Sequence, residues 1–176
     1  PPDFFHETRQ QIQGNRAKTL GVSIYSPEEL LKAMQIPEVG AVQFPASVAD
    51  RRFSPELLES ASKHGIALYA RSVFLQGALL ANASSLPEDL SPLSDVVREL
   101  RRECVKNSRS ASELAVGWVK ALPGITGLIL GAESGTQLDE VAQAFHSEPL
   151  SEDERENLEK LGLTDKAVLD PRQWNK

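Results

Sequence analysis

Short apolar runs alternate with longer segments of mixed polar and apolar residues along this chain. The apolar runs have the length of strands, and each segment after a run carries the start and stop signals of a helix. We predict strands at Leu20–Ile24, Ala41–Phe44, Ile66–Ala70 and Thr126–Leu130. A repeated strand–helix order builds a parallel sheet with helices on its outer face.

Serine residues mark the predicted helix starts. Ser26, Ser110 and Ser151 each have a glutamate three residues later, the pattern of a capping box, and Ser54 precedes a proline. The predicted helices span 3–13, 26–36, 54–65, 94–106, 111–122, 136–145 and 151–162. The connection Val73–Pro92 is longer than the others, and connections of that length are usually functional or mobile.

Chain length limits what this order of elements can build. Four strand–helix units are half of an eight-stranded (β/α)8 TIM barrel, which usually takes about 250 residues. The chain has 176 residues, begins with Pro1 rather than Met, and shows no internal linker. We therefore expect an α/β fold over residues 1–176 that forms a single partial barrel domain, with a cut or processed beginning.

Composition excludes several classes of function. The net charge of −6 and the pI near 5.2 argue against a nucleic acid or an anionic membrane as partner. No apolar run approaches the ~20 residues of a membrane span. The lone Cys104 permits neither a disulfide framework nor a cysteine metal cluster, and we expect it to be an inert thiol. A cytoplasmic location fits this composition.

Polar residues at the ends of the predicted strands are the candidates for chemistry, because function in parallel folds collects there. Ser23 and Gln43 end adjacent strands and offer neutral groups for an amide-bearing ligand, or they bond to neighbouring backbone. Arg71 ends the third strand. Its guanidinium could stack on a ring, hold a phosphate or carboxylate, or pair with a loop acid.

The segment Gly131–Gln137 follows the last strand and opens a helix. Backbone N–H groups at such a start attract phosphate, and glycines permit close approach. Glu133 opposes this, and no Lys or Arg occurs between Lys120 and Arg155, so a phosphate would meet only dipoles. No Ser-His-Asp pattern, metal-ligand spacing or P-loop is present.

Taken together, several short motifs resemble one known family. They are Gly21-Val22-Ser23, Val42-Gln43 with Asp50-Arg51-Arg52, Arg71-Ser72-Val73-Phe74-Leu75-Gln76-Gly77, Ser112-Glu113-Leu114-Ala115 with Trp118-Val119, and Gly131-Ala132 with Gln137-Leu138. In order and spacing they resemble the aldo-keto reductases from about residue 7 to the end. The likeness is strongest to a bacterial branch with the Arg-Ser-Val-Phe-Leu-Gln-Gly stretch and an ending like Asp170-Pro171-Arg172-Gln173-Trp174.

The resemblance implies a (β/α)8 barrel that binds NADP or NAD and reduces aldehydes and ketones, with this chain supplying strands five to eight. It assigns the nicotinamide carboxamide to Ser23 and Gln43, and the nicotinamide ring to Arg71. The loop from Ser72 to Gly77, with Phe74, would follow the pyrophosphate. Gly131, Ser134 and Gln137 would surround the adenosine phosphate. The family's catalytic aspartate, tyrosine, lysine and histidine lie in the other half of the barrel, so no catalytic residue is expected in this chain.

Departures from the family pattern leave a second hypothesis open. Ile24 replaces an asparagine, Ala46-Ser47 replaces a tyrosine-asparagine pair, Glu133 replaces a basic residue that often meets the 2′-phosphate, and Val141 replaces an adenine-binding asparagine. These changes disfavour NADP and motivate the alternative of a non-catalytic, barrel-derived binding or structural module. An open half barrel also exposes two edge strands. We therefore expect a missing N-terminal half or self-association, with a small carbonyl compound as the parent's substrate.

Overall fold

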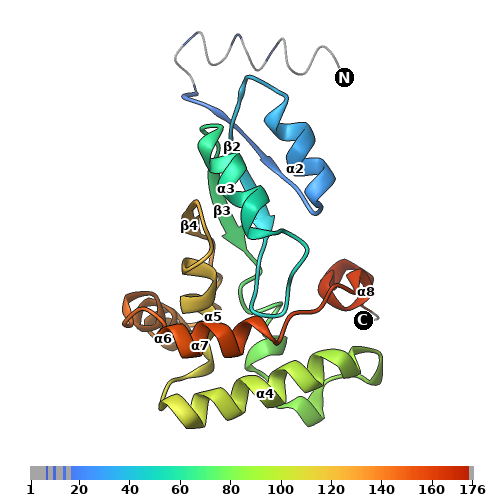
Figure 1. The fold of residues 1–176 in the computed structure, drawn as a ribbon, viewed down its shortest axis with the longest axis vertical. Coiled ribbons are helices and arrows are strands. Elements are labelled where there is room, and N and C mark those ends of the chain that lie inside the picture. Colours follow the sequence, from blue (N-terminus) through green and yellow to red (C-terminus); the bar gives the residue numbers. More distant parts are fainter. Residues whose placement is uncertain (1–6, 8–9, 11–13, 15–16, 175–176) are drawn as a thin grey trace.

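The computed structural model describes residues 7, 10, 14 and 17–174, and contains one four-stranded parallel sheet. Its strands are β1 (Leu20–Ser23), β2 (Val39–Pro45), β3 (Ala67–Arg71) and β4 (Ile125–Leu128), in the spatial order β1-β2-β3-β4 (Figure 1). The predicted parallel order is confirmed, and each strand bound differs from the predicted one by at most two residues. β1 and β4 are the edges of this sheet. The helix predicted over 3–13 lies outside the described residues, apart from positions 7 and 10.

Four helices begin directly after the serine residues that predict their starts, Ser26, Ser54, Ser110 and Ser151. The described α-helices are α2 (Pro27–Met34), α3 (Pro55–Lys63), α4 (Ser91–Asn107), α5 (Ala111–Lys120), α6 (Gly135–His146), α7 (Glu152–Glu159) and α8 (Lys166–Leu169). Capping boxes join Ser26 to Glu29, Ser110 to Glu113 and Ser151 to Glu154. Each box satisfies two backbone N–H groups that have no partner inside the helix, which explains why these starts could be located from the sequence.

Helices cover one face of the sheet. Val42, Phe44 and Leu68 point to that face and are fully buried, and they share a core with Leu30 of α2 and Leu58 of α3. Successive side chains on a strand alternate between faces. The opposite face therefore carries the residues between these buried ones.

That second face is open. Ser23 of β1, Gln43 of β2 and Tyr69 of β3 lie in register across it, with Ser23 exposed and Tyr69 37% exposed. Ile129, just beyond β4, is 44% exposed. Small or polar residues at most of these positions differ from the apolar pattern of a sheet that is buried on both faces.

The long connection after β3, predicted as Val73–Pro92, has secondary structure of its own. It contains three short 3₁₀ helices, η1 (Ala78–Leu80), η2 (Ala83–Ser85) and η3 (Glu88–Leu90), and α4 begins inside its predicted range, at Ser91. All three pack against α4. The layer with α4 lies beyond the carboxyl ends of the strands (Figure 1).

The segment after α7 returns to the carboxyl ends of the strands. Arg51, in the loop after β2, donates hydrogen bonds to the carbonyls of Leu158 and Glu159, at 2.8 and 3.0 Å, and stacks on Trp118 of α5. Asp50 and Leu163 form an isolated parallel bridge. Arg52, in the same loop, donates to the carbonyl of Leu169 in α8 at 3.5 Å. The 3₁₀ turn η4 (Pro171–Gln173) follows α8.

Candidate functional site

A groove lies at the carboxyl ends of β3 and β4, between the loop that follows β3 and the segment that leads from β4 into α6. Its volume is about 710 Å³, within the range of small-molecule sites. The lining residues come from three regions. They are Ser72, Val73, Phe74, Gln76, Gly77 and Leu80 after β3, Ser112 of α5, and Ile129, Leu130, Gly131, Ala132, Glu133, Gln137, Glu140 and Val141 after β4.

The first wall of the groove has a strained backbone. Ser72, Leu75 and Gln76 have φ values of 59°, 49° and 56°, and Gly77 has 83°. Each non-glycine residue in the left-handed region costs about 1–2 kcal/mol. Burial of the Leu75 side chain and the bond from Leu75 N–H to the Ser72 carbonyl, at 2.9 Å, hold the turn. Strain of this kind collects at ligand sites.

The second wall begins α6. The Ser134 hydroxyl accepts from Gln137 N–H at 3.2 Å, and Gln137 Oε1 accepts from Glu133 N–H at 2.7 Å. Two donors at this helix start are therefore used within the chain. A Cβ added at Gly131 would meet no atom within 4 Å. Because packing does not require glycine there, its missing side chain leaves free space on the groove side.

Ser23 and Gln43 lie side by side on β1 and β2. The Ser23 hydroxyl donates to Gln43 Oε1 at 3.0 Å, so these side chains satisfy each other rather than neighbouring backbone. This bond fixes the orientation of the Gln43 amide. Its NH₂ group is then the donor that remains for a ligand.

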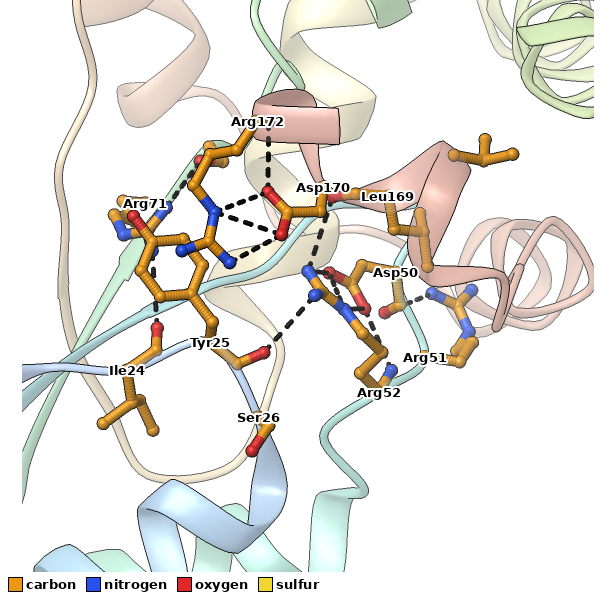
Figure 2. A network of polar contacts seen from close by, with 12 residues as sticks. Ile24, Tyr25, Ser26, Asp50, Arg51, Arg52, Arg71, Leu169, Asp170 and Arg172 are labelled. Atoms are coloured by element: carbon orange, nitrogen blue, oxygen red, sulfur yellow. Dashed lines mark hydrogen bonds and ion pairs between the residues drawn. The ribbon is translucent and has the colours of Figure 1, made fainter. Parts of the chain in front are cut away.

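Arg71 stacks on an aromatic ring of its own chain. Its guanidinium carbon lies 4.2 Å from the centre of the Tyr25 ring, and Arg172 contacts the same ring at 3.5 Å (Figure 2). Arg71 also donates to the Ile24 carbonyl at 3.3 Å and to the Ser72 hydroxyl at 3.2 Å. Among the described residues it forms no ion pair with a carboxylate, and its contacts there are with the Tyr25 ring, the Ile24 carbonyl and the Ser72 hydroxyl.

Two carboxylates complete this set of contacts, which we call the strand-end network. Asp50 pairs with Arg52 at 2.6 Å, with both side chains buried, and Asp170 pairs with Arg172 at 2.6 Å (Figure 2). Hydrogen bonds from Arg172 lower the pKa of Asp170 from 3.8 to about 2. Arg52 also donates to the Tyr25 carbonyl at 3.3 Å, which links both pairs to the end of β1.

The predicted site residues thus fall into four places. Ser72, Phe74, Gly77, Gly131 and Gln137 line the groove. Ser134 caps α6, Ser23 pairs with Gln43, and Arg71 belongs to the strand-end network.

Sequence reasoning missed Tyr25, Arg172 and Glu140 as members of these places. The strand-end rule does point to Tyr25, which lies two residues after the end of β1. Glu140 lies one helical turn after Gln137 on α6, which is a weaker signal. Nothing in the spacing of Arg172 points to Tyr25.

Other kinds of site receive no support in the part of the chain that the structure describes. No group of three His, Cys, Asp or Glu residues there could hold a metal ion. No helix among those residues is long and apolar enough to cross a membrane. Cys104 is half-buried on α4, and burial raises the pKa of its thiol, which disfavours the reactive thiolate.

Comparison with known proteins identifies the fold. Two solved structures superpose on nearly the whole chain. An aldo-keto reductase from Bacillus halodurans, in its holo form, matches with a TM-score of 0.73 and 22% identity over 94% of this chain and 57% of its own. The glycerol dehydrogenase from Gluconobacter oxydans matches with a TM-score of 0.70 and 20% identity over 95% of this chain and 54% of its own. The chain therefore spans little more than half the length of these structures.

Sequence comparison assigns the family. No curated protein matches the chain by sequence. The sequence profile of the Aldo/keto reductase family matches residues 11–162, which is most of the chain. The chain belongs to the aldo/keto reductase family.

Proposed function

We propose that this chain is the cofactor-binding half, barrel strands five to eight, of an NAD(P)-dependent oxidoreductase that reduces carbonyl compounds. The observation that carries the proposal is the groove at the strand ends, with its left-handed loop on one wall and a helix start on the other. When bound, the dinucleotide supplies the hydride. Our assignment leaves this chain the tasks of binding and orienting it.

The donors present match the parts of a dinucleotide. Ser72, Gln76 and Gly77 offer hydroxyl, amide and backbone groups along one wall. Phe74 and Ile129 offer apolar surface for a ring. The Gln43 amide lies on β2, the strand next to β3, where it could bond to a carboxamide. The hydrogen bond from Arg71 to Ser72 connects the groove to the strand-end network.

Binding of the cofactor can be measured on the chain as it stands. Calorimetry or fluorescence titration with NADH and NADPH should detect saturable binding below millimolar concentration. Gly131→Leu should weaken binding at least tenfold, because its side chain would fill the groove. Gly135→Ala is the matched control, since a Cβ there also meets no atom within 4 Å but the residue does not line the groove. Absence of binding at millimolar dinucleotide would reject the proposal.

We further propose that the open face of the sheet receives the other half of the barrel, or a second copy of this chain when that half is absent. The unpaired edges β1 and β4 and the exposed Tyr69 and Ile129 support this. Sedimentation velocity should show association that rises with concentration. Addition of the strand one-to-four half of the parent protein should suppress it and yield carbonyl reductase activity. A compact monomer at high concentration would contradict the proposal.

A non-catalytic binding module is the second candidate. Ile24 favours it, because this buried apolar residue stands where the family resemblance expects an asparagine beside the carboxamide. Dinucleotide binding without activity in the reconstituted barrel would support this candidate over the first.

A further inference from the structure

The groove has an uneven distribution of charge. Glu133 and Glu140 are its only charged lining residues among those described, so it carries two negative charges and no lysine, arginine or histidine. The cation closest to Glu133 along the chain is Lys120, whose ammonium group bonds to the Phe145 carbonyl and lies 4.7 Å from the centre of that ring. Arg71 adjoins the groove through Ser72 but is stacked on Tyr25.

The helix start on the second wall compensates little of this charge. Ser134 and Gln137 already accept two of the N–H groups at the beginning of α6. A phosphate at this wall would therefore meet fewer free donors than at an uncapped helix start. Each added negative charge on a ligand raises the repulsion from Glu133 and Glu140.

Carboxylates are suited to bind ribose hydroxyls rather than a phosphate. A carboxylate accepts hydrogen bonds only, and vicinal ribose hydroxyls are donors that two carboxylate oxygens can share. Acidic residues serve this purpose in other dinucleotide sites, where they distinguish a ribose 2′-hydroxyl from a 2′-phosphate. Glu133 and Glu140 lie on the same wall. Glu133 directly precedes the N-cap residue of α6, and Glu140 lies in the second turn of that helix.

We propose that this groove selects a dinucleotide with a free adenosine ribose, NAD(H), over its 2′-phosphorylated form, NADP(H), and that Glu133 and Glu140 determine the preference. This inference rests on the proposed function, because it requires that the groove bind a dinucleotide. It concerns the charge of the ligand, and so it can be tested without any turnover.

The test is a pair of calorimetric titrations of the chain, one with NADH and one with NADPH. We expect NADH to bind at least tenfold more tightly at low salt, and the ratio to shrink as salt screens the repulsion. Glu133→Gln and Glu140→Gln should each reduce the ratio severalfold, and Glu133→Lys should bring it close to one or invert it. Asp139→Asn removes the same charge from the same helix outside the groove, and it should leave the ratio within twofold of the unmodified chain.

The outcomes separate the two proposals. If neither dinucleotide binds, the proposed function fails. If both bind equally, or if NADPH binds more tightly, the selectivity is wrong while the groove remains a dinucleotide site. If NADH is preferred but Asp139→Asn changes the ratio as much as Glu133→Gln does, the preference is a property of overall charge, and the assignment to Glu133 and Glu140 is overturned.

Discussion

The strand-end network and the groove lie beside each other at the carboxyl ends of the strands, yet they are built in opposite ways. In the network, Asp50 and Asp170 each have an arginine partner, and Tyr25 is contacted by two guanidinium groups. In the groove, Glu133 and Glu140 form no ion pair with a described residue, and the backbone of one wall is strained. The charges of the network are paired within the chain, whereas those of the groove are left for a ligand to contact.

This difference indicates which residues at the carboxyl ends of the strands stabilise the fold and which are available for ligand binding. A buried charge without a partner destabilises the fold. The buried charges of the network are paired within the chain, so they are not available to bind a ligand. An exposed, strained wall costs stability and is retained where a ligand uses it. We therefore expect substitutions in the network to change the stability of the chain and substitutions in the groove to change binding.

The largest expected effect is at the buried pair of the network. Asp50→Ala leaves the Arg52 side chain, 6% exposed, without its carboxylate. Removal of one partner of a buried ion pair destabilises a protein by about 3–5 kcal/mol, and urea unfolding of the 176-residue chain measures it. Glu59→Ala breaks the exposed pair with Lys63 and should cost less than about 1 kcal/mol. Similar losses for both variants would show that the Asp50 pair is no more structural than a surface pair.

Tyr25 tests whether the ring itself holds the network together. Tyr25→Leu removes two cation–π contacts, with Arg71 and Arg172, and should lower the free energy of unfolding by about 1–3 kcal/mol. Tyr25→Phe keeps the ring and should stay within about 0.5 kcal/mol of the unmodified chain. If the phenylalanine variant were as unstable as the leucine variant, the hydroxyl and not the stack would be the stabilising group.

Asp170 gives the network a pH dependence. Its pKa is about 2 in the folded chain and 3.8 in the unfolded reference, so its contribution is complete above about pH 5 and is lost as the pH falls towards 2. Because Arg172 is partly exposed, we expect about 1–2 kcal/mol from this group at neutral pH. Asp170→Asn should therefore unfold more easily in urea at pH 7 and behave like the unmodified chain near pH 2. A difference that persists at pH 2 would assign the effect to packing.

The sequence predicts the strands and helices that form the site better than it predicts the side-chain contacts between them. Short apolar runs and the start and stop signals of helices are local, and they locate all four strands and six of the seven described helices. α8 is only four residues long and has no periodicity to detect. The two walls of the groove follow β3 and β4, so the rule that ligands bind at strand ends indicates both.

The network could not be derived in this way. Arg172 reaches Tyr25 from the far end of the chain, and no spacing relates two such residues before the fold brings them together. The left-handed residues of the first wall, Ser72, Leu75 and Gln76, are also hidden from sequence reasoning, because their types do not favour positive φ.

The smallest expected effect is on the strained wall of the groove. Gln76→Gly should stabilise the chain by about 0.5 kcal/mol, because relief of a left-handed φ of 56° exceeds the entropy cost of glycine. Gln35→Gly is the matched control: Gln35 is also exposed, but its φ is −84°, so glycine there should destabilise by about 0.5–1 kcal/mol. Urea unfolding of both variants decides the sign. If Gln76→Gly destabilised the chain as much as its control, the wall would carry no strain, and the contrast between the groove and the network would rest on charge alone.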